Sequence, residues 1–278
     1  IAVSSYQGGH MEFFFYMLDL LKEKNSGHIK VFAGGGGVII QSEIQELTKY
    51  GVSRVYSPED GRELGLMGMI ADMLKRSDFP VLPEKFEIHN DKLVAENIQH
   101  IAQSLTWIEQ NAKGSQLTTE GPIVETPEAV QKVLKKLHSQ DSTVGKSLAP
   151  VIGLTGTGGA GKSCLTDELV RKFLDEFPEK RVAILSVDPS KRKTGGALLG
   201  DRMRMNAIND HRVYMRSLAT RRSHLATSNS LEDAVSLLQA TGKFCGVGFD
   251  LILVETAGIG QSDSEISDFV DLSVYVMT

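Results

Sequence analysis

Short apolar segments alternate with amphipathic segments over the first part of the chain. Residues 1–3, 29–33 and 52–56 are apolar and β-prone, and apolar residues recur at helical spacing over 10–22, 42–50 and 64–75. Gly8-Gly9 follow the first apolar segment, and a turn is expected at residues 58–61. Strands alternating with helices predict a parallel sheet. Three such pairs are too few for a complete doubly wound domain, so we expect part of one over residues 1–78.

The pattern changes over residues 79–150. Prolines at positions 80, 83, 122 and 127 interrupt this stretch, and two helical segments are expected, over 89–112 and 127–137. We interpret residues 79–150 as a helical linker.

A second α/β pattern begins at residue 151. Apolar strands are expected over 151–154, 181–187, 213–217 and 251–254, with helices over 162–177 and 231–241 and a strand-like segment at 273–278. Continuous apolar runs are typical of strands that are covered on both faces. We therefore expect a mostly parallel sheet in a second domain over residues 151–278.

A glycine-rich loop separates the first strand of this second domain from its first helix. Residues 156–163 read Gly-Thr-Gly-Gly-Ala-Gly-Lys-Ser, the complete phosphate-loop pattern with the correct flanks. In such a loop Lys162 contacts the β- and γ-phosphates and Ser163 places its hydroxyl on Mg²⁺. The backbone that would cradle the phosphates belongs to Gly158, Gly159, Ala160 and Gly161. The loop predicts a Mg²⁺-dependent nucleoside-triphosphate site, with Lys162 as a catalytic residue.

Acidic residues end two strands of the same domain. Asp188 follows one strand and Glu255 ends another, and in a parallel sheet these ends face the ligand crevice. Both are candidate metal residues, Glu255 also a catalytic one, although Asp188 before Pro189 also suits a turn cap. Thr256 is a further metal candidate, and the amide of Gly258 is placed to sense a γ-phosphate. A flexible glycine turn remains the simpler alternative for the segment after Glu255.

The basic, glycine-rich stretch 191–205 lies between these two acidic positions. As a mobile switch it would bring Asp201 to the metal and Arg204 to a phosphate. A solvated loop explains the same composition equally well.

Small residues also follow the strands of the first domain. Ser4 and Tyr6 come after its first strand, and Gly35, Gly36 and Gly37 come after its second. Small residues at adjacent strand ends leave a slot for a flat or elongated ligand, but tight strand-to-helix turns explain them more simply. His10 is expected to begin a helix rather than to act as a base.

Composition limits the choice of function class. A net charge of -5 without a basic face argues against a nucleic-acid partner. No apolar run is long enough to span a membrane and no signal peptide is recognised. The two cysteines match no metal spacing, so a reducing cytoplasm is expected. The chain opens without Met and closes on a strand, and we expect it to be an internal piece of a longer polypeptide.

The motifs together resemble a known family. GTGGAGKS at 156–163, SVDPS at 186–190, TGGALLGDRMRM at 194–205 and ETAGIGQSD at 255–263 resemble the G-protein chaperones of cobalamin-dependent acyl-CoA mutases. AVSSYQGGH at 2–10, VFAGGGGVI at 31–39 and GVSRVYSPEDG at 51–61 resemble the back half of a flavodoxin-like cobalamin-binding domain. The order of these parts is similar to that of the fused isobutyryl-CoA mutases, and the resemblance is weakest over the linker.

The resemblance implies a function and a set of partners. It implies Mg²⁺ and GTP or GDP in the second domain, adenosylcobalamin in the parent protein, a mutase barrel as partner domain and a homodimer. GTP hydrolysis would gate cobalamin loading of an enzyme that interconverts isobutyryl-CoA and n-butyryl-CoA. Ser4 and Tyr6 would lie beside the buried dimethylbenzimidazole tail, which the glycines at 35–37 admit. Lys162, Ser163, Asp188, Asp201 and Glu255 match the nucleotide and metal site.

Some family motifs are missing from the sequence. The cobalt-ligand motif DxHxxG is absent, so no cobalt ligand is named, and the guanine-reading NKxD motif is absent, so GTP over ATP depends on the resemblance alone. Two other functions stay open. One is a non-catalytic, cobalamin-responsive nucleotide switch, and the other is a metal-insertion GTPase, for which His or Cys clusters would be expected.

Overall fold

The computed structural model divides the chain into two compact units, residues 1–81 and 82–278. It describes residues 1–83, 85–111, 127–139, 148–189, 205–220, 230–243, 246–256, 258, 266–267 and 269–278. Within these residues, the helices are all too short or too polar to cross a membrane.

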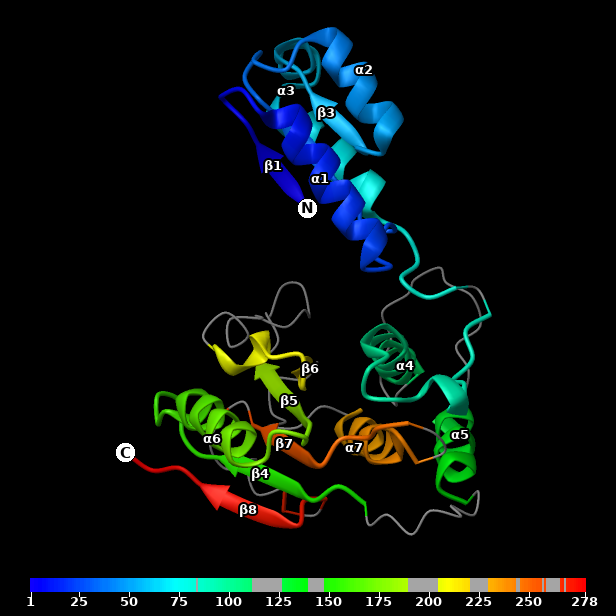
Figure 1. The fold of residues 1–278 in the computed structure, drawn as a ribbon, viewed down its shortest axis with the longest axis vertical. Coiled ribbons are helices and arrows are strands. Elements are labelled where there is room, and N and C mark those ends of the chain that lie inside the picture. The colour runs from blue at the N-terminus through cyan, green and yellow to red at the C-terminus, as the bar shows by residue number, and fades with distance from the viewer. Residues whose placement is uncertain are drawn as a thin grey trace. The chain divides into compact units, whose positions relative to one another are not determined.

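The first unit is a three-stranded parallel sheet with its helices (Figure 1). Its elements are β1 (Ala2–Ser4), α1 (His10–Glu23), β2 (Phe32–Gly34), α2 (Gln41–Tyr50), β3 (Arg54–Tyr56) and α3 (Pro58–Ser77). The strands lie in the order β1-β2-β3, in register through Val3, Ala33 and Val55. Phe14 of α1 and Leu47 of α2 are fully buried in the core of this unit. The predicted alternation of strands and helices is confirmed.

Helix α3 begins earlier than the sequence pattern predicts, and Gly65, with φ 62° and ψ 174°, kinks it, so that its second segment covers most of the helix expected over 64–75. Residues 58–61, expected as a turn, form its first turn, and Pro58 occupies the first helical position. Ser57 accepts a hydrogen bond from the Asp60 amide, and the Asp60 side chain accepts one from the Ser57 amide. This reciprocal cap, together with a proline whose missing N–H costs nothing at this position, starts the helix.

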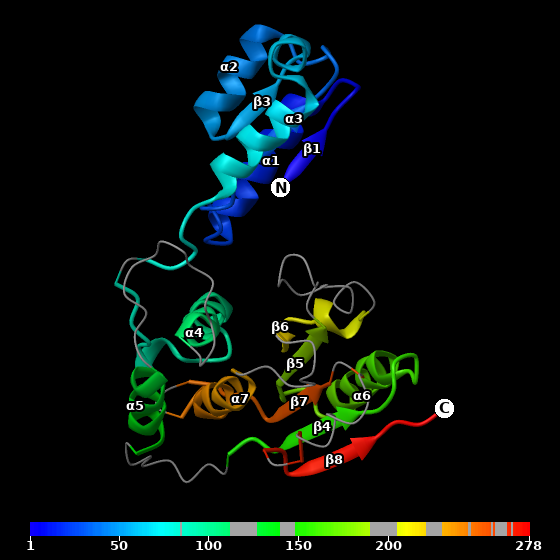
Figure 2. The same cartoon turned by 180° about the vertical axis from the view of Figure 1, so that it is seen from behind.

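The second unit contains a five-stranded parallel sheet in the order β6-β5-β7-β4-β8. The strands are β4 (Val151–Thr155), β5 (Val182–Pro189), β6 (Val213–Thr220), β7 (Leu251–Glu255) and β8 (Leu272–Tyr275). Figure 2 shows β8 beside β4, at the edge of the sheet. Strand β4 therefore lies between β7 and β8, and β4 leads directly into the phosphate loop.

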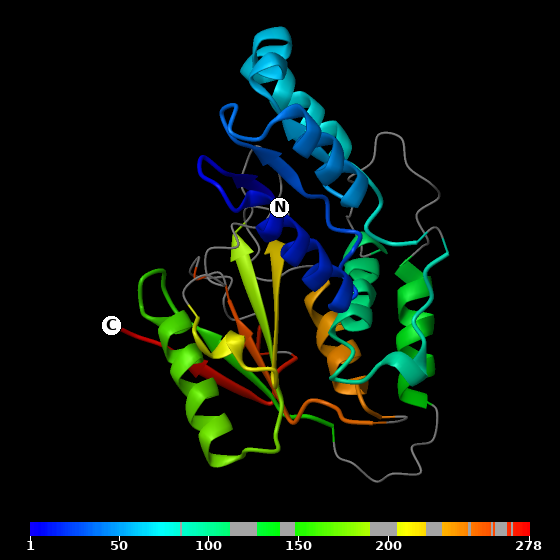
Figure 3. The same cartoon turned by 45° about the horizontal axis from the view of Figure 1, so that its top comes forward.

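Helices cover both faces of this sheet (Figure 3). Helix α6 (Lys162–Glu176) packs on one face, where Val170 and Leu174 meet Leu154, Ile184 and Leu253. Helix α7 (Leu231–Ala240) covers the other face through Leu237 and Leu238. The two covered faces explain why the strands read as continuous apolar runs.

Two helices of the predicted linker belong to the core of the second unit. Helices α4 (Ile98–Asn111) and α5 (Pro127–Ser139) pack on α7, and Ile101, Leu105 and Val130 join its hydrophobic cluster. The expected helix over 89–112 is wrong at its start. A 3-10 turn, η1 (Asn90–Lys92), precedes α4, and the Asn97 side chain accepts from the His100 amide. An asparagine at this position caps a helix, which explains why α4 begins only at Ile98.

Candidate functional site

The phosphate loop joins β4 to α6 as its sequence predicts. Gly156, Gly159 and Gly161 have φ values of 141°, 84° and 90°, in the region that favours glycine. Gly161 is the N-cap residue of α6, so the loop ends directly on a helix N-terminus. Amides and the helix dipole therefore favour an anion at this end of α6.

Lys162 is buried at the first position of α6. Its side chain is held within the loop, because Nζ donates to the carbonyl oxygens of Gly156 at 2.9 Å and Thr157 at 3.1 Å. Only 7% of the residue is exposed. A buried ammonium must be hydrogen-bonded, and here the carbonyls of the loop accept its hydrogen bonds.

Glu255 meets α6 through two hydroxyl groups. Ser163 Oγ donates to Glu255 Oε1 at 2.5 Å, and Thr166 Oγ1 lies 3.1 Å from Glu255 Oε2. Glu255 is 3% exposed, and Leu154 at the end of β4 is its register partner. The adjacency of β4 and β7 thus brings together Ser163 and Glu255, which lie 92 positions apart in sequence.

The residues after β7 return to the phosphate loop. Thr256 is 2% exposed, and its hydroxyl lies 3.3 Å from the Thr155 hydroxyl. Gly258 has a φ of 68°, and a Cβ built on it would lie 2.4 Å from Lys162 Nζ and 3.2 Å from the Gly158 amide nitrogen. Gly258 therefore packs directly against the predicted phosphate-binding atoms.

The remaining nucleotide-site predictions are only partly described. Asp188 lies at the carboxyl edge of the sheet, where its backbone pairs with Ala219, two positions beyond the Ser186–Glu255 pair. Asp201 and Arg204 lie outside the described residues.

In the first unit, the loops after β1 and β2 touch each other. Ser4 ends β1, and the Ser5 amide donates to the Gly34 carbonyl at 2.8 Å. A Cβ on Gly35 would lie 2.4 Å from the Ser5 carbonyl oxygen, and a Cβ on Gly36 would lie 2.8 Å from the Tyr6 ring. Bare glycine backbone is thus required here for the close approach of the two loops.

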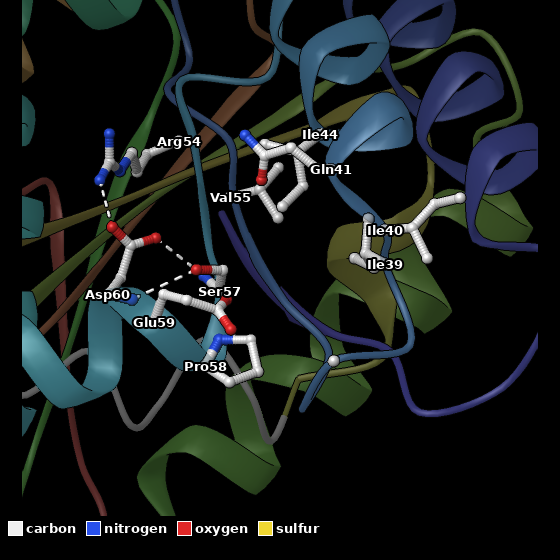
Figure 4. Close-up of a pocket in the computed structure, with 11 residues that line it drawn as sticks. Ile39, Ile40, Gln41, Ile44, Arg54, Val55, Ser57, Pro58, Glu59 and Asp60 are labelled. Carbon is white, nitrogen blue, oxygen red and sulfur yellow. Dashed lines mark hydrogen bonds and ion pairs between the residues drawn. The ribbon is translucent and has the colours of Figure 1, made fainter.

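Gly37 forms part of a hollow at the outer side of β3 (Figure 4). The hollow extends from the start of α2 to the start of α3, with Pro58 facing Gly37. On its polar side, Asp60 accepts a hydrogen bond from Arg54 at 2.5 Å and caps α3 through Ser57. Ser4, Tyr6 and the glycines at 35–37 lie together at the carboxyl ends of two adjacent strands, β1 and β2.

A family model described as methylmalonyl-CoA mutase-associated GTPase MeaB matches residues 118–278. The chain belongs to the MeaB family. It is also similar over its full length to fused isobutyryl-CoA mutases, 52% identical to that of Geobacillus kaustophilus and 50% to that of Cupriavidus metallidurans. Over 53% of its length it is 36% identical to the mitochondrial methylmalonic aciduria type A homolog of Mus musculus, 34% of which is covered.

The chain spans about a quarter of the length of its fused relatives, 24% and 23% of the two mutases named above. The predicted resemblance, to a fused mutase with a G-protein chaperone domain, is confirmed.

Sequence reasoning missed Thr166, a residue that contacts two of the predicted site residues. This residue is fully buried, and its hydroxyl contacts both the Lys162 carbonyl and the Glu255 carboxylate. The signal was present in the spacing, because residues three and four apart on a helix share one face. Thr166 stands three positions after Ser163 and four after Lys162.

Proposed function

We propose that the chain is a Mg²⁺-dependent, GTP-hydrolysing chaperone module that gates cobalamin loading of a fused acyl-CoA mutase. The observation that carries the hydrolytic part is the buried contact of Glu255 with Ser163 and Thr166, beside the buried Lys162. A carboxylate held on the first turn of the phosphate-loop helix suits a catalytic metal site.

The donor atoms on this edge of the sheet fit Mg²⁺. Ser163 and Glu255 offer a hydroxyl and a carboxylate, and we assign Asp188, Asp201 and Thr256 to the same metal site. Oxygen ligands of this kind are those that Mg²⁺ prefers. The bound metal would neutralise charge on the transferring phosphoryl group.

The nucleotide would be held by the loop and the segment after β7. We assign the phosphates to the backbone of residues 158–161, to Lys162 and to Arg204, and the γ-phosphate to the amide of Gly258. Lys162 would supply positive charge where negative charge develops, and Glu255 would orient groups around the reacting phosphate. The closeness of Gly258 to Lys162 supports this assignment, because a movement of Gly258 would also displace the Lys162 ammonium.

The first unit is proposed to bind adenosylcobalamin. Ser4, Tyr6 and the glycines at 35–37 would contact its nucleotide tail, a proposal supported by their grouping at the carboxyl ends of the neighbouring strands β1 and β2. The fused relatives support a mutase barrel as partner and isobutyryl-CoA as substrate of the whole protein. A cytoplasmic homodimer is proposed from the same likeness.

Calorimetry and turnover on Lys162→Ala test this function. We expect the full-length wild-type protein to bind GTP more tightly than ATP and to hydrolyse it with Mg²⁺, and its Lys162→Ala variant to lose both properties. Lys172→Ala, an exposed lysine of the same helix, is the matched control and should behave as wild type. Unchanged hydrolysis in Lys162→Ala would refute the site, ATP preference would refute the GTPase, and tight GTP binding without turnover would indicate a non-catalytic switch.

A further inference from the structure

One carboxylate connects the two loops that carry the proposed cobalamin residues. Glu43 Oε2 lies 3.1 Å from His10 Nε2 and accepts from the Ile40 amide at 2.9 Å. His10 follows the loop after β1, and Ile40 ends the glycine loop after β2. Glu43 therefore joins the N-terminal ends of α1 and α2.

This arrangement exceeds what a helix cap requires. At the third position of α2, Glu43 caps the helix through the Ile40 amide alone. The second contact goes to His10, a residue that is 8% exposed and whose Nδ1 lies 3.4 Å from the Gln7 carbonyl oxygen. The imidazole thus spans from its own loop to the carboxylate on the neighbouring helix.

The charge state of Glu43 suits this contact. The Ile40 amide and the His10 ring lower the pKa of Glu43, so the side chain is a carboxylate at neutral pH. A carboxylate only accepts hydrogen bonds, and the imidazole therefore donates from Nε2. Charge-assisted hydrogen bonds of this kind are shorter and stronger than neutral ones.

The two loops contact each other so closely that neither can move towards the other without a clash. The Tyr6 ring rests on Gly36, and the Ser5 carbonyl lies where a Cβ of Gly35 would be. A shift of His10 against Glu43 would move these surfaces past each other. The binding of a ligand to these loops therefore depends on the loop positions that His10 and Glu43 fix.

We propose that His10 and Glu43 are a positioning pair that sets the separation of the two loops and thereby the affinity of the first unit for the nucleotide tail of cobalamin. The proposal rests on the cobalamin binding proposed above. Neither residue contacts the corrinoid in this proposal, and both act through the loops that they connect.

Titration of two corrinoids into the full-length protein tests the pair. Adenosylcobalamin carries the nucleotide tail, whereas cobinamide lacks it. For His10→Gln and for Glu43→Gln, which keeps an acceptor for Ile40, we expect adenosylcobalamin affinity to fall about tenfold, from the loss of one charged hydrogen bond. Cobinamide affinity should stay at the wild-type value. The double variant should be no weaker than the weaker single variant, since the two side chains act as a unit.

Controls separate positioning from general damage. Glu12→Gln and Glu46→Gln remove exposed carboxylates from the same two helices and should leave both affinities unchanged. The inference would be overturned by an equal loss of affinity for both corrinoids, by additive losses of affinity in the double variant, or by an unchanged affinity for adenosylcobalamin. Each of these results would leave the proposed cobalamin binding itself intact. Wild-type protein that binds neither corrinoid would overturn the proposed cobalamin function and this inference with it.

Discussion

Thr166→Val isolates the contribution of one hydroxyl to the Glu255 site. Valine has nearly the same shape as threonine, so the change removes the hydroxyl without opening a cavity. Thr166 is fully buried, and its Oγ1 lies 3.1 Å from Glu255 Oε2 and 3.0 Å from the Lys162 carbonyl oxygen. The hydroxyl carries a single proton, which these two acceptors share, so the variant removes one hydrogen-bond donor from the buried carboxylate and the helix carbonyl.

The expected loss of stability follows from these contacts. A hydrogen bond to a charged group contributes about 1.5–3 kcal/mol, and the apolar valine returns part of that loss. We expect the free energy of unfolding to fall by about 2 kcal/mol. For a unit of this size that corresponds to a drop in Tm of roughly 4–8 °C.

Trp107 provides the assay, because it is the single tryptophan of the chain and packs against the core of the second unit. Its fluorescence during urea unfolding reports this unit alone. Thr166→Ser, which keeps the hydroxyl and loses a methyl group, is the matched control. It should lose stability through packing, but it should keep the wild-type Mg²⁺ dependence of GTP hydrolysis.

The same variant tests the role proposed for Glu255. Thr166 holds the carboxylate independently of Ser163, so Thr166→Val should raise the Mg²⁺ concentration needed for half-maximal hydrolysis by about tenfold, the equivalent of one such hydrogen bond. The reasoning is refuted if Thr166→Val unfolds within about 0.5 kcal/mol of wild type, the range of a neutral substitution, and hydrolyses GTP with unchanged Mg²⁺ dependence.

Three further predictions use other parts of the second unit. Gly258→Ala should weaken GTP binding at least tenfold, because its Cβ would lie 2.4 Å from Lys162 Nζ, and unchanged fluorescence titration with a labelled GTP would contradict this. Ser186→Ala should keep or raise stability in the urea assay, since this buried hydroxyl has no hydrogen-bond partner among the residues that the structure describes, and a loss above about 1 kcal/mol would disprove it. Arg212 lowers the pKa of Asp210 to about 2, so this pair stabilises the fold above the ordinary carboxyl value of 3.8 and stops doing so as pH falls towards 2. Asp210→Asn should flatten the acid unfolding curve over that interval, and an unaltered curve would show that the pair contributes nothing.

The strand ends of the nucleotide site were predictable because parallel strands impose their own geometry. Glu255 and Ser163 had to meet once β4 and β7 became neighbours, and the apolar runs identified both strands. Thr166 was not predicted: its spacing places it on the helix face of Lys162 and Ser163, but the spacing does not say that this face meets the Glu255 carboxylate. The contact between His10 and Glu43 joins positions 33 apart, and no local pattern indicates which helices pack side by side.

The predicted starts of α3 and α4 are wrong because the local sequence there permits two structures. Ser57-Pro58-Glu59-Asp60 suits a turn and a capped helix start equally well, and the residues that follow decide between them. At the start of α4, the apolar spacing extends upstream of Ile98. The Asn97 side chain accepts a hydrogen bond from the His100 amide, and this cap sets the start of the helix at Ile98. In both cases side-chain hydrogen bonds to backbone amides mark where the helix begins.

The glycines of the phosphate loop also show that a local sequence motif does not reveal which physical constraint selects a residue. A Cβ on Gly159 would meet no atom within 4 Å, so its φ of 84° alone requires glycine there. Gly156 is different, because a Cβ on it would lie 2.2 Å from the Val276 carbonyl oxygen, just after β8. The Val276 amide also donates to the Thr155 carbonyl, which fixes the end of β8 against the start of the loop. The first glycine of the motif is therefore required by the neighbouring strand as well as by the turn. The sequence motif shows only that glycine stands at this position. The packed sheet shows that both the backbone conformation of the turn and the contact with Val276 require it.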